Sequence, residues 1–411
     1  MIFFSYSFFI FIALFFGAYW IFNGYRTRRW ILLIGCASFH TYYAGPAGVL
    51  PILLLGLGTY FTGILRNRNL CILWIIVCVI ALVLYKYTYF FFDGIVSFIS
   101  PDLSRMGVGI TKGLLPELPP LAISFFTFEF IHYLIEIHRG HKPIRSPLTF
   151  ALFAIFWPSL VAGPVKRYQQ FVVSAARGMK QIGYDDVRIG MARVALGISK
   201  KLAADTMTPW INFWGDRIHE QPVEIQWTIF VALGVRIFLD FSGYSDMAIG
   251  FAKMMGIKLP ENFNWPYLAV SINDFWKRWH ISLSSWIRDY IYIPLGGNQC
   301  GIVRKVFNGF AAMAICGLWH GASWNFIVWG LYHGLGLTIS NFLGGGIRHL
   351  KLRAMDSKFA IFSDPIFLNF SHRIWIFICW ALTLLFVLFG WVLFFYPLDK
   401  AWAIIRLLLR V

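Results

Sequence analysis

Two histidines stand in surroundings that could support proton transfer. His320 lies in the stretch CGLWHGASW between two apolar runs, and His280 lies in the aromatic and basic stretch FWKRWHISL. A neutral imidazole can take a proton from a hydroxyl near pH 7 and pass it on. An ionisable side chain inside an apolar segment is a functional candidate, although a histidine that bonds a neighbouring carbonyl would explain it equally well. The residues alone leave both interpretations of His320 open.

The segment around His280 is aromatic and charged at once. The spacing predicts a helix over Ser271–Asn298 in which Trp276, Trp279, His280 and Leu283 share one face. An interfacial helix with a tryptophan belt and snorkelling bases would also produce this composition. The pattern therefore indicates a helix at the membrane boundary and leaves its chemistry open.

Two further stretches carry polar groups within apolar sequence. Arg236 and Asp240 have helical i,i+4 spacing, so we expect them to neutralise each other, with a polar cavity lining as the alternative. Pro158 and Gly163–Pro164 predict a broken helix that ends at the basic residue Lys166. A broken helix at membrane depth is tolerated where protein buries it or where it lines a cavity. A plain helix end with a basic interfacial anchor is the simpler explanation of the same residues.

The elements that must position these residues are membrane helices. The 411-residue chain is 58% hydrophobic and only 13% charged, whereas soluble chains carry about 25% charged residues. Runs of roughly 20 apolar residues span a bilayer as helices. We therefore expect an all-α polytopic protein with roughly ten to eleven spans plus interfacial and re-entrant helices. We expect one integral membrane domain over 1–411, divided into N-terminal spans at 1–118, a catalytic core at 119–343 and C-terminal spans at 344–411.

The net charge of +17 is best explained by membrane topology. The basic clusters at Arg26–Arg29, Arg66/Arg68 and Arg139–Arg145 fall between apolar runs, as cytoplasmic loops do. This places the N-terminus on the non-cytoplasmic side of the membrane and predicts no nucleic-acid partner. Some of the excess could attract an anionic acyl donor or an acidic partner.

Sequence signatures of bound cofactors and metals are missing from the chain. None of the six cysteines forms a CxxC pair, and no P-loop, HExxH or GxSxG motif occurs. We expect no bound cofactor and no metal.

The longest motifs together resemble the membrane-bound O-acyltransferase family. The resemblance rests on FWKRWHISLSSWIRDYIYIPLGGN, GLWHGASWNFIVWG, LDFSGYSDMAIG, FWPSLVAGPVKRYQQF and PLAISFFTFEFIHYLIEIHRG. It extends from about residue 120 to the last helices. It is nearest to the bacterial branch that holds the alginate O-acetylation and teichoic-acid D-alanylation membrane proteins.

This resemblance implies a ring of helices around a central tunnel. A cytosolic thioester, either acetyl-CoA or an acyl carrier protein, would enter from one side and an acceptor hydroxyl from the other. By motif, the family's catalytic histidine falls on His320 and its second, more cytosolic histidine on His280. The resemblance also implies a secreted or periplasmic acyltransferase partner.

Three functions remain open at this point. The first is transfer of an acyl group, expected to be acetyl, toward an extracytoplasmic polysaccharide or a partner protein. The second is a D-alanyl transferase of teichoic acid that is fed by an acidic carrier protein. The third is a non-enzymatic lipid or solute transporter, which usually shows duplicated halves with broken helices. No such duplication is visible in the sequence.

Overall fold

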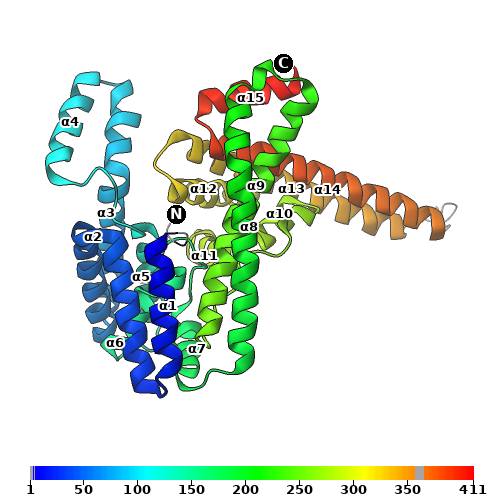
Figure 1. The fold of residues 1–411 in the computed structure, drawn as a ribbon. Helices are drawn as coiled ribbons and strands as arrows, with labels where there is room; N and C mark the ends of the chain where they lie inside the picture. Colours follow the sequence, from blue (N-terminus) through cyan, green and yellow to red (C-terminus); the bar gives the residue numbers. More distant parts are fainter. Residues whose placement is uncertain (1–2, 4, 357–364) are drawn as a thin grey trace. The chain divides into compact units, whose positions relative to one another are not determined.

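Helices are the only regular secondary structure in the residues that the structure, a computed structural model, describes: residue 3, 5–356 and 365–411. Six helices there are long and apolar enough to cross a membrane (Figure 1). They cover Ala47–Leu65, Arg68–Phe98, Val223–Met254, Ile302–His320, Trp324–Leu343 and Arg373–Phe395. The number is below the expected ten to eleven because other apolar runs form shorter helices, such as the 16-residue helix α1. The prediction of a polytopic helical membrane protein is confirmed.

The chain divides into two compact units. The first contains Met1–Lys200 and Gly243–Pro260, and the second contains Lys201–Ser242 and Glu261–Val411. Two long helices, α8 (Tyr184–Asp216) and α9 (Val223–Met254), contribute residues to both units.

The first unit is built from helical hairpins. Its remaining helices are α1 (Tyr6–Ile21), α2 (Tyr25–Leu65), α3 (Arg68–Gly94), α4 (Pro101–Leu114), α5 (Ile123–His138), α6 (Pro147–Ala154) and α7 (Tyr168–Lys180). Helix α2 includes a kink at Gly45, whose φ of 66° suits glycine because no side chain opposes it.

The three basic clusters lie at the same end of the first unit. Arg29 donates a hydrogen bond to Ser146 Oγ at 3.2 Å, and the Tyr60 hydroxyl donates to the Arg145 carbonyl at 2.7 Å. The cluster at Arg66 follows directly on the C-terminus of α2, six residues beyond Tyr60. This arrangement fits the prediction that the three loops face one side of the membrane.

Glycines bring α8 and α9 into close contact within the first unit. A Cβ added at Gly190 would lie 2.8 Å from the Gly250 carbonyl oxygen, and one at Gly197 would lie 2.6 Å from that of Gly243. Small residues allow membrane helices to approach in this way. Moving along α8 from Gly190 to Gly197, the contacted residue on α9 moves back from Gly250 to Gly243, so the two helices pack antiparallel.

The second unit holds the C-terminal helices. They are α10 (Ile272–Arg278), α11 (Ile281–Ile287), α12 (Ile302–His320), α13 (Trp324–Asp356), α14 (Pro365–Phe395) and α15 (Leu398–Leu409), with a π-helical turn at Arg288–Tyr292. Within this unit, helices α12 and α13 have the most extensive contact. They form a hairpin whose turn is at residues 321–323.

The predicted helix break after Pro158 is confirmed, but the following lysine is not an interfacial anchor. Helix α6 ends at Ala154, and the chain stays largely irregular until α7 begins at Tyr168. Lys166 is 1% exposed, and its Nζ lies 2.6 Å from Glu129 Oε1 on α5. A buried cation must be paired, since leaving it alone in a low-dielectric interior would be costly. The sequence suggested a solvated base, whereas the fold buries an ion pair.

Candidate active site

The chain around His280 is broken at the histidine itself. Helix α10 ends at Arg278 and α11 begins at Ile281, so the predicted single helix over Ser271–Asn298 is wrong. His280 has φ 43° and ψ 52°, the left-handed conformation that costs a residue with a side chain about 1–3 kcal/mol. Such strain persists only where the surroundings enforce it, and it often marks functional sites.

Asn262 enforces this break. The Asn262 carbonyl accepts a hydrogen bond from the Ile281 amide at 2.9 Å. The side-chain oxygen of Asn262 lies 3.0 Å from His280 Nδ1 and accepts from the Ser282 amide and hydroxyl at 3.3 and 2.8 Å. These contacts replace the helical bonds that are lost where α10 stops.

The same contact fixes the tautomer of His280. An amide oxygen only accepts, so the proton between Asn262 and the ring must reside on His280 Nδ1. The other nitrogen, Nε2, then presents a lone pair, and it has no hydrogen-bond partner within the described residues. Burial, with a smaller contribution from His320, holds the pKa of His280 well below its usual value of about 6.5. His280 is therefore neutral at pH 7, as a proton acceptor must be.

His320 is the last residue of α12 and is held against α13. The two helices touch through glycines, because a Cβ at Gly317 would lie 2.1 Å from the Phe326 carbonyl oxygen and one at Gly330 would lie 2.3 Å from that of Met313. This close packing brings the Trp329 ring to 5.2 Å from the His320 ring, centroid to centroid.

The fold brings the two predicted histidines together. The ring centroids of His280 and His320 lie 6.5 Å apart, and the Trp319 ring lies 5.9 and 4.9 Å from them. His280 is 0% exposed, whereas His320 remains partly accessible. His280 is therefore an interior residue and does not lie at an open mouth. Of the two, His320 is the histidine that a substrate can reach in this conformation.

A cavity of about 430 Å³ runs along the face of α12 that leads to His320. Residues of α12 line it at helical spacing: Ile302, Lys305, Val306, Gly309, Ala312, Met313 and Cys316. Two more bases, Lys277 and Arg288, line it from other elements, and Trp276 and Ile281 line it next to His280. Within the described residues no carboxylate pairs with Lys277 or Lys305. The cavity thus combines the positive charge of these bases with an apolar wall that reaches Cys316, one helical turn before His320, and Ile281, the neighbour of His280 in sequence.

Other polar candidates near His320 have structural partners. The Asn325 side-chain amide donates to the Phe394 carbonyl at 3.2 Å, which engages one of the groups that could otherwise stabilise an oxyanion. His333 is 0% exposed, and the rings of Trp329 and Trp276 lie 4.9 and 5.2 Å from it. It packs in the aromatic core, as its sequence context suggested.

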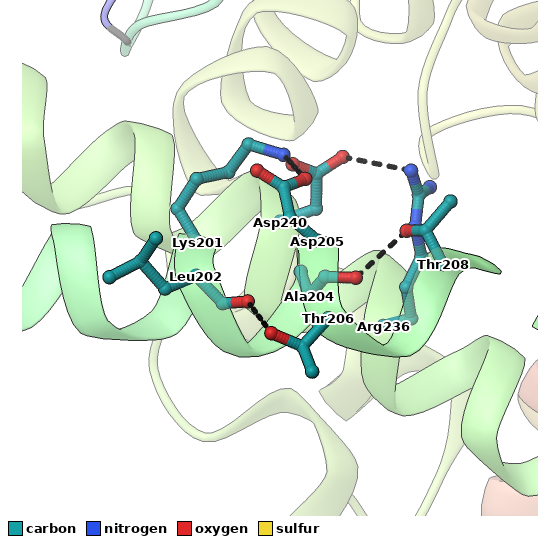
Figure 2. A network of polar contacts seen from close by, with 8 residues as sticks. All are labelled: Lys201, Leu202, Ala204, Asp205, Thr206, Thr208, Arg236 and Asp240. Atoms are coloured by element: carbon teal, nitrogen blue, oxygen red, sulfur yellow. Dashed lines mark hydrogen bonds and ion pairs between the residues drawn. The ribbon is translucent and has the colours of Figure 1, made fainter. Parts of the chain in front are cut away.

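The predicted pair of Arg236 and Asp240 is confirmed as part of a larger network (Figure 2). Arg236 Nη2 lies 3.7 Å from Asp240 Oδ2, and its Nε donates to Thr208 Oγ1 at 3.1 Å. Lys201 pairs with Asp240 at 2.6 Å and also with Asp205. The two cations of this network, on Lys201 and Arg236, balance its two carboxylates. This balance supports a structural ion-pair network over a cavity lining.

Sequence reasoning missed three residues, two in the second unit and one in the first. Asn262 lies in an irregular stretch without periodicity, and only its place 18 residues before His280 links the two. Lys305 stands at the N-terminal end of an apolar helix, where it resembles a topology signal. Glu129, the partner of Lys166, lies 37 residues away. In the described part of the chain no three His, Cys, Asp or Glu side chains are grouped as metal ligands would be.

An all-helical membrane chain with a neutral buried histidine, a second accessible one and a basic cavity between helices defines a membrane-embedded transferase. A sequence profile of the membrane-bound O-acyltransferase family matches residues 120–389. The chain belongs to this family, and it is an acyltransferase.

Named relatives agree with this assignment. "Probable alginate O-acetylase AlgI" of Pseudomonas aeruginosa is 34% identical over 94% of this chain and 70% of its own length. "Peptidoglycan O-acetyltransferase" of Helicobacter pylori is 32% identical over 63% of this chain and 53% of its own. "Teichoic acid D-alanyltransferase" of Bacillus subtilis is 30% identical over 55% of this chain and 62% of its own.

Proposed function

We propose that the protein moves an acetyl group from a cytosolic thioester to a hydroxyl of an extracytoplasmic polysaccharide, directly or through a partner protein. The observation that carries the proposal is the pair His280–His320, whose ring centroids lie 6.5 Å apart, together with a basic cavity along α12 that reaches Cys316, four residues before His320. The substrate class follows relatives that match over most of this chain, such as the Pseudomonas aeruginosa protein named "Probable alginate O-acetylase AlgI". Membership of an acyltransferase family disfavours the transporter alternative.

His320 has the role of general base in this proposal. An alcohol is a weak nucleophile until a base removes its proton. As His320 takes that proton, the acceptor oxygen attacks the thioester carbonyl and forms a tetrahedral intermediate. The carbon–sulfur bond then breaks, and the imidazolium returns the proton to the leaving thiolate. The products are an ester and a free thiol. His320 transfers one proton from the hydroxyl to the thiolate, so the reaction consumes no proton.

His280 supports His320 in the proposed reaction. Its lone pair on Nε2 faces an interior from which water is excluded, and its neutral ring adds no charge that would oppose the imidazolium stage. Asn262 orients this ring through Nδ1, much as a third group orients the base in other nucleophilic sites.

The basic cavity is proposed to hold the donor. Fifteen residues separate Lys305 from His320, which corresponds to about 22 Å along α12. Coenzyme A and the prosthetic group of acyl carrier proteins share a phosphate at one end of a long linear arm and a thioester at the other. With the phosphate near Lys305 and Arg288, such an arm would follow Gly309, Ala312 and Cys316 toward His320.

Reversing one cavity charge should weaken donor binding. We expect Lys305→Glu to raise the KM for a soluble acyl-thioester about tenfold with little change in kcat, because one charge-assisted contact is worth about 1.5–3 kcal/mol. The measurement is steady-state thiol release by purified protein in nanodiscs. The matched control is Lys258→Glu, which makes the same change at an exposed site of the first unit. Equal KM values for both variants would argue against a donor phosphate at Lys305.

The membrane orientation is also part of the proposal. The N-terminus is placed outside the inner membrane, so that the loops at Arg26–Arg29, Arg66 and Arg139–Arg145 are cytoplasmic. Their location at one end of the first unit supports this placement. An acyl group passed from the cytosolic donor then reaches the outer side without a separate carrier.

Gene deletion in the host tests the polysaccharide assignment. We expect ester-linked acetate on isolated surface polymer to be lost, membrane-lipid acyl chains to be unchanged, and a plasmid copy to restore the acetate. Acetate and D-alanine are both quantified after alkaline release. Loss of D-alanine alone would favour the teichoic-acid reaction, and loss of a lipid acyl chain alone would replace the polymer with a lipid acceptor.

A further inference from the structure

Helix α4 presents large apolar side chains outward and small polar ones inward. Its buried positions are Ser104, Gly107 and Thr111, and a Cβ at Gly107 would lie 2.2 Å from the Phe92 ring of α3. The exposed row contains Phe98, Ile99, Leu103, Met106, Ile110 and Leu114, each at least 53% exposed. We call this row, with the turn before α4, the α4 stripe. If this stripe lay inside the membrane, lipid would cover it. The depth of the stripe relative to the bilayer therefore decides whether lipid or protein contacts it.

The α4 stripe lies beyond the hydrocarbon core. Helix α3 rises about 31 Å from Arg68 to Tyr89, which already equals the hydrocarbon thickness of about 30 Å. The Tyr89 hydroxyl donates to the Leu115 carbonyl at 3.0 Å, so the end of α4 is level with this boundary. The irregular chain at 115–121, of which 116–119 are exposed, agrees, because lipid-exposed irregular backbone does not occur in hydrocarbon.

The first residues of the stripe lie farthest from the bilayer. From Tyr89 the chain continues upward through the end of α3 and the turn at Val96–Phe98 before α4 returns (Figure 1). Five more α-helical residues and one 3₁₀ turn add about 13 Å, more than the headgroup layer of about 5–7 Å. Phe98, Ile99 and Leu103 are therefore in water if nothing else covers them.

The charge of this hairpin does not suit a lipid surface. Residues 87–121 contain Asp93, Asp102 and Glu117 against Arg105 and Lys112, a net charge of −1 in a chain of +17. The two bases are already engaged, Arg105 with Asp102 at 2.5 Å and Lys112 with Glu117 at 3.2 Å. Helices that lie on anionic membranes carry free bases on their polar face. An apolar centre with a slightly acidic, mixed rim is instead the composition of a protein interface.

We propose that the α4 stripe docks a soluble extracytoplasmic protein with an apolar patch that has a neutral or basic rim. Its side of the membrane is opposite the basic loops, where the proposed function delivers its acyl group, and the inference rests on that function. A protein bound there would receive the acyl group or present the polymer. The hairpin would then act in delivering the acyl group to the acceptor and would take no part in the reaction of the thioester donor.

A charge placed on the stripe tests this docking. We expect Leu103→Glu combined with Met106→Glu to lower polymer-bound acetate in cells about tenfold, because burying unpaired charges at the centre of an interface is unfavourable. Thiol release by the same protein in nanodiscs should stay within about twofold of wild type. Lys258→Glu is the control, since it makes the same change of two charges at an exposed site of the first unit outside this hairpin and should leave both measurements unchanged.

The outcomes separate the possible occupants. Normal polymer acetate in the double variant, at wild-type protein levels, would overturn the docking while leaving the proposed function intact. A fluorophore at Met106→Cys in a cysteine-depleted protein that lipid-attached quenchers reach in nanodiscs would assign the stripe to lipid. A crosslink between two copies through the same cysteine would assign it to self-association. Failure of the wild-type protein to release thiol would instead count against the proposed function.

Discussion

His320→Ala should abolish acyl transfer while leaving the protein folded in the membrane. Loss of one general base typically costs about 10²–10⁴ in rate, and here no other accessible imidazole could replace it, since His280 is buried. The His320 ring packs against Trp329 and Phe394, so thermal unfolding of the variant in detergent is measured beside its activity. The measurement is single-turnover transfer from a labelled acyl-thioester to a hydroxyl acceptor in nanodiscs.

A matched histidine variant controls for nonspecific effects in this experiment. His219→Ala removes an exposed histidine of the same unit, whose side chain is 69% exposed, and should behave as wild type. Donor binding by His320→Ala should also be normal, because the cavity bases are unchanged. Transfer by a stably folded His320→Ala protein at more than about a tenth of the wild-type rate would exclude His320 as the base.

Local sequence predicts the parts of this fold that depend on local patterns. The apolar runs predict most of the spans because hydrocarbon leaves helices as the only option for an apolar segment without a closed barrel. Pro158 and Gly163–Pro164 predict the helix break, since proline removes a backbone donor and clashes with the preceding turn. The i,i+4 spacing of Arg236 and Asp240 predicts their pairing because helical geometry alone brings them together.

Long-range contacts explain what the sequence could not reveal. The helical pattern continues without interruption through His280, yet the chain breaks there because Asn262 supplies the hydrogen bonds that the helix would have made. Lys166 looks like a solvated base until Glu129 is placed beside it. The family resemblance identified His280 and His320, but neither motif predicts that the rings lie 6.5 Å apart.

The Asn262 contact yields the second prediction. We expect His280→Ala to lower kcat about a hundredfold and Asn262→Ala about tenfold, because the second variant keeps the imidazole but frees its tautomer and its strained backbone. Since both act through one ring, the double variant should be no slower than His280→Ala alone. Purified proteins are compared by thiol release, with thermal unfolding in detergent to confirm equal folding.

Asn262→Asp separates orientation from simple packing. The substitution keeps the oxygen that accepts from His280 Nδ1 but adds a negative charge, which favours the imidazolium form and raises the pKa of His280. Because the proposed reaction needs His280 neutral, the acidic limb of the rate profile should move to higher pH, with activity recovered in alkaline buffer. A packing role alone would lower the rate equally at every pH. Independent, additive losses in the double variant together with an unshifted profile would show that Asn262 does not act through His280.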